Sequence, residues 1–336
     1  MISSTQPQAP SRIQAMIQNN WSINKPLTIL TVGCAIISVL AIFGVLADPR
    51  QILGQPVWAK TTKFSISIAL YGSSMLWMLG MLKTRASRIA GNIIGATLIL
   101  EMILLITQAV RGRAMHFNIA TPIDTALWGT MSFGILVFSI AAIVATILLL
   151  RVKLESRVLV WSLRLGLILA ILGFAQASLM TGPNNLQINA LKSGQQLEMI
   201  GAHTVGVLKD GGPGIPFLGW STDHGDLRIG HFIGMHGLQI IPLFGFFLIR
   251  RRSRWLTESH RVGLVFIAAI GYAGLVGLVT WQALRDQSII SPDALTLQAL
   301  AAIIGTVALS SLAVIFHARS KLVTIRRVLG DIHENR

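Results

Sequence analysis

The sequence contains very few cysteines and very few charged residues. Among its 336 residues there is one cysteine, Cys34, so a disulfide within the chain is excluded, as is a Cys-x-x-Cys-His haem-attachment motif. Charged residues make up only 12% of the chain, whereas a soluble domain contains about 25%. The low charge therefore argues against a soluble globular protein.

Signatures of common enzyme active sites are missing as well. The chain contains no phosphate-binding loop, no Gly-x-Ser-x-Gly elbow and no His-Glu-x-x-His zinc helix. A membrane hydrolase would therefore lack a convincing nucleophile. The sequence also shows no internal repeat, which leaves an inverted-repeat transporter fold without positive support.

Long apolar runs are the most prominent feature that the sequence does have. Hydrophobic residues make up 53% of the chain and form runs that reach the roughly 17–25 residues needed to cross a bilayer as a helix. These runs do not alternate as membrane β-strands would. We therefore expect an all-α, polytopic membrane helix bundle with about eight transmembrane helices, near residues 27–47, 64–82, 89–110, 125–150, 158–181, 229–249, 261–284 and 295–316.

The distribution of the +15 net charge predicts the orientation of these spans. If the N-terminus is cytoplasmic and the spans alternate, the inner segments carry about twice as many Lys and Arg residues as the outer segments. We therefore expect both termini in the cytoplasm and contacts between the inner basic segments and anionic lipids. No basic segment carries a nucleic-acid recognition motif, so nucleic acid is not an expected partner.

The domain organisation follows from these spans. Residues 1–26 are expected to be a cytoplasmic segment, partly disordered or forming an interfacial helix, and residues 317–336 a basic cytoplasmic tail. The transmembrane domain covers residues 27–316, and its first span is too long for a signal peptide, so we expect an uncleaved anchor. Residues 182–228 form the longest loop, whose apolar content predicts that it folds back as a lid on the helix ends.

Glu101 is an ionisable residue deep in the third predicted span. Thr97 and Gln108 fall within about 40° of it around a regular helix and form one polar stripe with it. Such a stripe serves either as hydrogen-bonding contact between helices or as a site wall. We assign Glu101 as the candidate catalytic, proton-handling residue. If the third and sixth spans are neighbours, Glu101 could meet His236.

The stretch RIGHFIGMHGLQ (228–239) places His231 and His236 in an apolar segment. The two imidazoles lie about 140° apart on a regular helix, so they cannot bind one ion together without a distortion. Gly230, Gly234 and Gly237 lie on a third face. That face favours either close packing of a neighbouring helix or close approach of a flat cofactor.

Five histidines fall on the predicted outer side, in two loops and one span. Imidazoles and carboxylates are the usual ligands of zinc, copper and non-haem iron, and two imidazoles ligate b-type haem. We assign His203, His224 and Asp226 as candidate metal ligands, and His236, His231 and His116 as candidate cofactor ligands. Arg111, Arg113 and Arg228 are candidates for binding an anionic group of the cofactor, although each could instead pair with an aspartate or a lipid phosphate.

Three segments carry a resemblance to a known group of proteins. The stretches RGRAMHFNIATPID (111–124), GAHTVGVLKDGGPGIPFLGWST (201–222) and GDLRIGHFIGMHGLQIIP (225–242) are similar to a family of bacterial multi-pass membrane proteins with no assigned activity. The resemblance covers most of the chain from about residue 26. It implies a location in the bacterial inner membrane, but no reaction and no site residues.

Three hypotheses about function follow. The first is a redox or metal-site protein that holds b-type haem or a transition metal near the outer leaflet through histidines. The second is a proton-coupled transporter or channel for a small solute, lined by Glu101, Gln108 and His236. The third is a non-catalytic membrane assembly partner, in which the polar contacts are structural and single substitutions at the outer histidines change nothing measurable.

Overall fold

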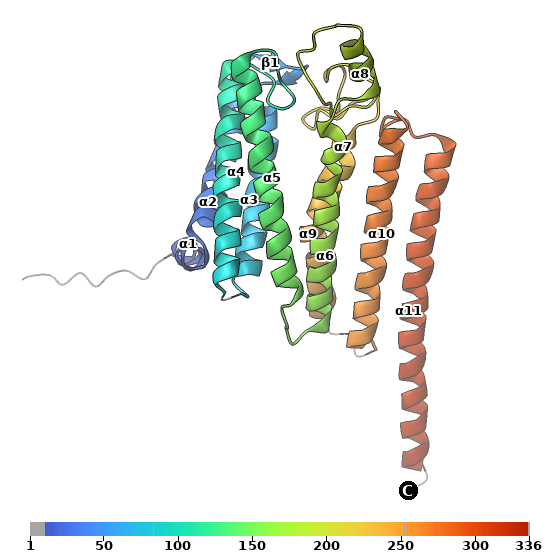
Figure 1. Ribbon diagram of the computed structural model, residues 1–336. Helices are drawn as coiled ribbons and strands as arrows, with labels where there is room; N and C mark the ends of the chain where they lie inside the picture. The colour runs from blue at the N-terminus through green and yellow to red at the C-terminus, as the bar shows by residue number, and fades with distance from the viewer. Residues whose placement is uncertain (1–10, 83, 252, 254, 335–336) are drawn as a thin grey trace, which may run out of the picture. The chain divides into compact units, whose positions relative to one another are not determined.

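The computed structural model describes residues 11–82, 84–251, 253 and 255–334, with side chains described as far as residue 321 (Figure 1). The regular secondary structure of this part of the chain is helical except for two very short strands. The elements are α1 Arg12–Ile23, α2 Lys25–Ala47, β1 Gln51–Ile52, β2 Gln55–Pro56, α3 Ala59–Leu79, α4 Arg85–Arg111, α5 Pro122–Leu150, α6 Arg157–Gln176, α7 Ser178–Thr181, α8 Asn185–Lys192, α9 Leu227–Arg250, α10 Glu258–Leu284 and α11 Ala294–Glu334.

Seven helices in the described part of the chain are long and apolar enough to cross a membrane. They include α2, α4, α5, α9 and α10, a stretch that runs from α6 through α8, and α11 up to Lys321. The prediction of a helical membrane protein is therefore confirmed. The predicted span at 64–82 does form a helix, α3, but its composition keeps it outside the seven, because Lys63 and several serines lower its hydropathy.

The two ends of the chain are more helical than the sequence suggested. The amphipathic stretch near Trp21 forms α1, which begins with a capping box in which Ser11 and Gln14 exchange side-chain and backbone hydrogen bonds. Residues 1–10, where disorder was expected, lie outside the described residues. The segment 317–334, expected to be a basic tail, continues the helix of α11.

The chain divides into two compact units. Unit 1 contains α1 to α4 and residues 129–149 of α5. Its helices α2 and α4 meet where Asn24 caps the start of α2, and the Asn24 amide donates to Asn92 Oδ1 over 2.9 Å. Leu27, Ile94 and Leu105 have no exposed surface and form part of the apolar interior of this unit.

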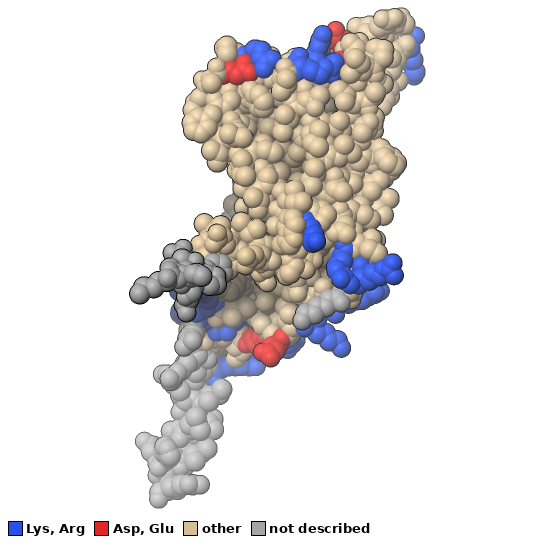
Figure 2. All heavy atoms as spheres, turned by 90° about the vertical axis from the view of Figure 1, so that its left-hand side faces the viewer, with Lys and Arg blue, Asp and Glu red and all other residues tan. Residues whose placement is uncertain are grey.

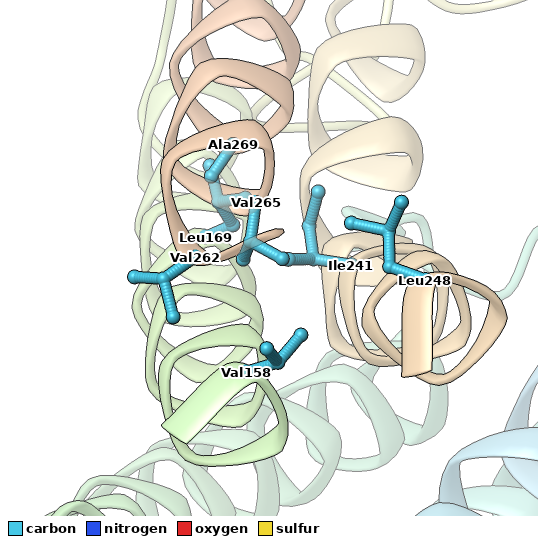
Figure 3. Packing of buried hydrophobic residues seen from close by; sticks show 7 residues of the cluster. All are labelled: Val158, Leu169, Ile241, Leu248, Val262, Val265 and Ala269. Carbon is cyan, nitrogen blue, oxygen red and sulfur yellow. The ribbon is translucent and has the colours of Figure 1, made fainter. Parts of the chain in front are cut away.

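Unit 2 comprises residues 51–55, 114–128 and 150–336. Its apolar core lies between α6, α9 and α10 (Figure 3). The seven residues of this cluster are Val158, Leu169, Ile241, Leu248, Val262, Val265 and Ala269. Because these side chains come from three different helices, their burial fixes α6, α9 and α10 against one another.

The long loop (residues 182–226) packs on the helix ends of unit 2. Met199 of this loop joins a buried cluster with Met180 of α7, Leu227 of α9 and Ala283 of α10. Gln187 of α8 is fully buried, and its amide bonds to the backbone of Gly201 through both its oxygen and its nitrogen. The loop is therefore fixed by a small apolar cluster beneath it and by hydrogen bonds between the buried Gln187 amide and backbone groups of the loop.

Charged side chains gather near the two ends of the helices, and mostly uncharged residues cover the band between them (Figure 2). This pattern is expected when a hydrocarbon layer surrounds the middle of the helices, because an ionised side chain there costs several kcal/mol. The loop end of a helix is the end next to the long loop in unit 2, or the end at the level of Arg111 in unit 1.

Candidate functional site

A buried histidine–carboxylate pair organises the long loop. His203 Nδ1 binds Asp210 Oδ2, and both side chains are largely buried. The same carboxylate accepts the backbone N–H groups of His203 (2.9 Å) and Thr204 (3.1 Å). Burial on its own would raise the pKa of Asp210, but the positive charge and hydrogen bond of His203, together with the charge of Arg228, hold that pKa well below its usual range.

Aromatic rings surround this pair. The Phe117 ring centroid lies 4.8 Å from that of His203 and 5.0 Å from that of Trp128. His116 lies 5.8 Å from His203, measured between ring centroids. The predicted cofactor residue His116 and the predicted metal residue His203 are therefore neighbours. Their surroundings, however, are a packed aromatic cluster in which Phe117 is 3% exposed.

Asp226 and Arg228 form a second polar group at the start of α9. Asp226 caps the helix by accepting the backbone N–H of Arg228, and it also accepts the N–H of Ser221 over 2.9 Å. The Arg228 guanidinium binds the Asp226 carboxylate through Nε and donates to the carbonyl oxygen of Gly219. Arg228 is thus paired with an aspartate, which is the alternative that the sequence left open for it.

His224 makes a third, separate pair. Its Nδ1 lies 3.0 Å from Asp286 Oδ1, and both side chains are about two-fifths exposed. The three predicted metal ligands therefore have three different partners: Asp210 for His203, Asp286 for His224, and Arg228 for Asp226. Across the residues that the structure describes, no group of three His, Cys, Asp or Glu side chains is arranged to hold a metal ion. The metal hypothesis gains no support from this geometry.

The glycine face of α9 is filled by other helices of unit 2. A Cβ atom on Gly234 would lie 2.6 Å from Gly173 Cα of α6, and one on Gly237 would lie 2.7 Å from Leu169 Cβ. Only glycine permits this approach, so the face packs closely against α6. This geometry gives no support to a flat cofactor on that face.

His231 and His236 have different environments on α9. His231 Nδ1 lies 2.7 Å from the carbonyl oxygen of Gly173 and is held at the α6 interface. The His236 ring packs edge-on against Phe232, with centroids 4.4 Å apart. Its Nε2 atom is buried and has no hydrogen-bond partner among the described residues. Of the two imidazoles, His236 therefore retains a nitrogen that a ligand or proton acceptor could use.

Glu101 lies in the interior of unit 1. It is 3% exposed, and Gln108, two turns nearer the loop end of α4, is 1% exposed. The positive charge of Lys60 in α3 acts on the Glu101 carboxyl. The third residue of the predicted polar stripe, Thr97, uses its hydroxyl proton within its own helix, where it donates to the carbonyl oxygen of Ile93.

The other two predicted anion-binding arginines are near the loop end of α4. Arg111 is exposed and donates to Gln108 Oε1 over 2.5 Å. Arg113 is also exposed. Arg111 therefore connects the buried polar stripe of α4 with the surface, which sequence reasoning did not anticipate.

Sequence reasoning missed a group of hydroxyl residues in α3. Thr61, Thr62 and Ser65 have no exposed surface, and the Ser38 hydroxyl of α2 donates to Ser65 Oγ over 3.0 Å. Thr61 Oγ1 is buried and has no hydrogen-bond partner among the described residues. The signal in the sequence was the polar run AKTTK (59–63), which looked like the loop before the second span but forms the first turns of a buried helix.

Glu101 and His236 belong to different units. A contact between them stays a prediction. No protein-family model, curated protein or solved structure matches the chain. The likeness to bacterial multi-pass membrane proteins therefore remains a resemblance.

Proposed function

We propose that the protein is a proton-coupled transporter of a small solute, and that Glu101 takes up and releases the proton. The observation that carries this proposal is the place of the Glu101 carboxyl, 3% exposed and ten residues from the loop end of a 27-residue helix long enough to span a membrane. Ten helical residues correspond to about 15 Å, or half the hydrocarbon thickness.

A carboxyl at this depth is a costly way to hold two helices together. A hydrogen bond between membrane helices contributes about 0.6 kcal/mol of stability on average. A serine or glutamine can form such a bond without an ionisable group. Carboxyls inside spans are typical of proton relays in pumps and transporters. The positive charge of Lys60 in α3 acts on the Glu101 carboxyl. The Lys60 ammonium also lies over the face of the Phe64 ring, 5.9 Å from its centroid.

Polar groups continue from Glu101 toward that end. Gln108 lies two turns nearer and accepts the Arg111 guanidinium, which is exposed. Buried Thr61 of α3 adds a hydroxyl oxygen without a hydrogen-bond partner among the described residues. These groups support a route by which a proton or a small polar solute reaches Glu101 from the loop end.

The proposal is tested in proteoliposomes that contain a trapped pH-sensitive dye. Pools of amino acids, sugars, monocarboxylates and organic cations are added to the outside, and the rate of internal pH change is recorded. We expect at least one pool to drive proton movement that protein-free liposomes lack. A protein of intact fold that moves no protons with any pool would contradict the proposal.

The proposed setting is the bacterial inner membrane, with both termini in the cytoplasm. The resemblance of the sequence and the excess of Lys and Arg in the segments assigned to the inner side support this setting. The same basic segments are suited to contact with anionic lipid headgroups.

A second candidate function is haem binding through His236. One observation favours it, namely the buried Nε2 atom without a hydrogen-bond partner among the described residues, because Nε2 is a nitrogen through which imidazoles ligate metals. An absorption spectrum of protein purified in mild detergent, before and after reduction with dithionite, tests this candidate. A Soret band that is lost in His236→Ala would support it, and a spectrum without that band would exclude it.

A further inference from the structure

A groove lies between α6 and α10 of unit 2, and neither His236 nor the polar pairs of the long loop line it. Its volume is about 380 Å³, within the range of small-molecule sites. The lining residues that matter here are Leu169, Leu172 and Gln176 of α6, Leu179 of α7, and Val276 and Gly277 of α10.

The groove is almost wholly apolar but ends in fixed polar groups. Its deeper part is lined by leucine, valine, alanine and glycine side chains. At the loop end, the Thr280 hydroxyl proton is shared between the carbonyl oxygen of Val276 (2.7 Å) and Gln176 Oε1 (2.9 Å), and the second contact orients the amide. Since that bond uses the amide oxygen, the amide nitrogen of Gln176 remains available as a hydrogen-bond donor.

The groove is open toward the surroundings of the helices. Leu172 and Leu179 are about half exposed. Gly277 forms part of the wall, and a Cβ atom there would meet nothing within 4 Å among the described residues. Because α6 and α10 are both membrane-length helices, the medium that faces this opening is lipid rather than water.

The length of the groove matches one leaflet. From Leu169 to Leu179 the chain advances ten residues, or about 15 Å at helical rise, which is half of a hydrocarbon layer about 30 Å thick. A chain that enters from the loop end would therefore reach the middle of the bilayer. Trp281 of α10 lies one residue beyond Thr280 and is partly exposed, as is typical of aromatic side chains near the membrane–water boundary.

From this geometry we infer that the groove binds one acyl chain of a membrane glycerolipid, with its ester oxygen accepting a hydrogen bond from the Gln176 amide. The apolar wall takes the hydrocarbon, and the polar end recognises the group that joins the chain to the glycerol. An open apolar face without such an end would not distinguish an ester lipid from any other lipid tail.

The test uses full-length protein in liposomes that contain a phosphatidylethanolamine with a photoactivatable diazirine in one acyl chain. After irradiation, labelled peptides are mapped by mass spectrometry. We expect the peptides that carry Leu172 and Val276 to be labelled well above those of α11. A saturating amount of the same unlabelled lipid should reduce this labelling to the α11 level while leaving α11 itself unchanged.

Two variants sharpen the test. Gly277→Leu fills the groove and should reduce the labelling of α6 and α10 to the α11 level. Gly33→Leu in α2 is the matched control, since a Cβ atom there also meets nothing within 4 Å in the described part of the chain, and it should keep full labelling. Equal labelling of all lipid-facing helices in wild-type protein would overturn the inference, as would labelling that resists the unlabelled competitor. A groove that is labelled only by a photoactivatable polyprenyl probe would overturn its assignment to an acyl chain.

Discussion

His203 and Asp210 bind each other through their side chains, and the Asp210 carboxylate also accepts the backbone N–H group of His203. One carboxylate thus fixes both the imidazole and the chain that carries it. Because Asp210 lies near the middle of the long loop and His203 seven residues before it, the pair closes the loop on itself. The loop gains structure from a buried ionic contact that no sequence periodicity reveals.

We predict that Asp210→Asn loosens the long loop. The substitution removes the negative charge that His203 and two backbone N–H groups share, and breaking a buried pair of this kind costs about 3–5 kcal/mol. Hydrogen-exchange mass spectrometry should show faster exchange of the amides of His203 and Thr204. The exposed neighbour Asp223 supplies the control, since Asp223→Asn should leave both amides protected.

The same pair predicts a dependence of loop stability on pH. The folded-state pKa of Asp210 is depressed, so its contribution is fully present above the unfolded-state pKa of about 3.9 and declines as the pH falls from there toward the folded-state pKa. Protection of the loop amides in wild-type protein should therefore weaken below about pH 4. In Asp210→Asn this acid-induced loss should be absent, and an equally steep loss in the variant would contradict the assignment.

We predict that Gly173→Ala destabilises unit 2. A Cβ atom at this position would lie 2.5 Å from the Gly234 carbonyl carbon of α9, so the two helices must move apart. Overpacking of this kind typically costs about 1–3 kcal/mol. The unfolding temperature in detergent should fall for Gly173→Ala. It should stay unchanged or rise for Gly305→Ala in α11, where a Cβ atom meets no described residue within 4 Å.

Removal of divalent metal ions should leave the protein unchanged. His203, His224 and Asp226 have separate partners, and no group of three ligands is assembled within the described residues. Treatment with EDTA should therefore not shift the unfolding temperature, and elemental analysis should find less than one zinc or copper per chain. A stoichiometric metal that His203→Ala removes would restore the metal hypothesis.

Composition and charge were enough to predict the class of fold. Apolar runs of membrane length can be buried only as helices, so α2, α4, α5, α9 and α10 followed from the sequence within a few residues. Helix α3 shows where this reasoning is weaker. A helix that other helices surround can carry Thr62 and Ser65, because their hydroxyls bond within the protein, and hydropathy alone then mistakes its beginning for a loop.

The candidate site was less predictable for a related reason. Sequence reasoning identified Glu101 and Asp226 as residues that must be explained, but not which partner each histidine would take. His203 pairs with an aspartate seven residues away, whereas His224 pairs with Asp286 across 62 positions. Such choices depend on how the long loop folds, and its turns rest on buried contacts such as those of Gln187. No local pattern in the sequence encodes these contacts.

The central claim is that Glu101 binds the transported proton, and Glu101→Gln tests it most directly. The measurement is the initial rate of solute-driven pH change in proteoliposomes, together with the unfolding temperature of the same preparation. Glu198→Gln is the control, since Glu198 lies in the long loop as an exposed partner of Lys209. We predict that Glu101→Gln abolishes proton movement without lowering the unfolding temperature, while Glu198→Gln keeps the wild-type rate. Proton movement at the wild-type rate in Glu101→Gln would contradict the account.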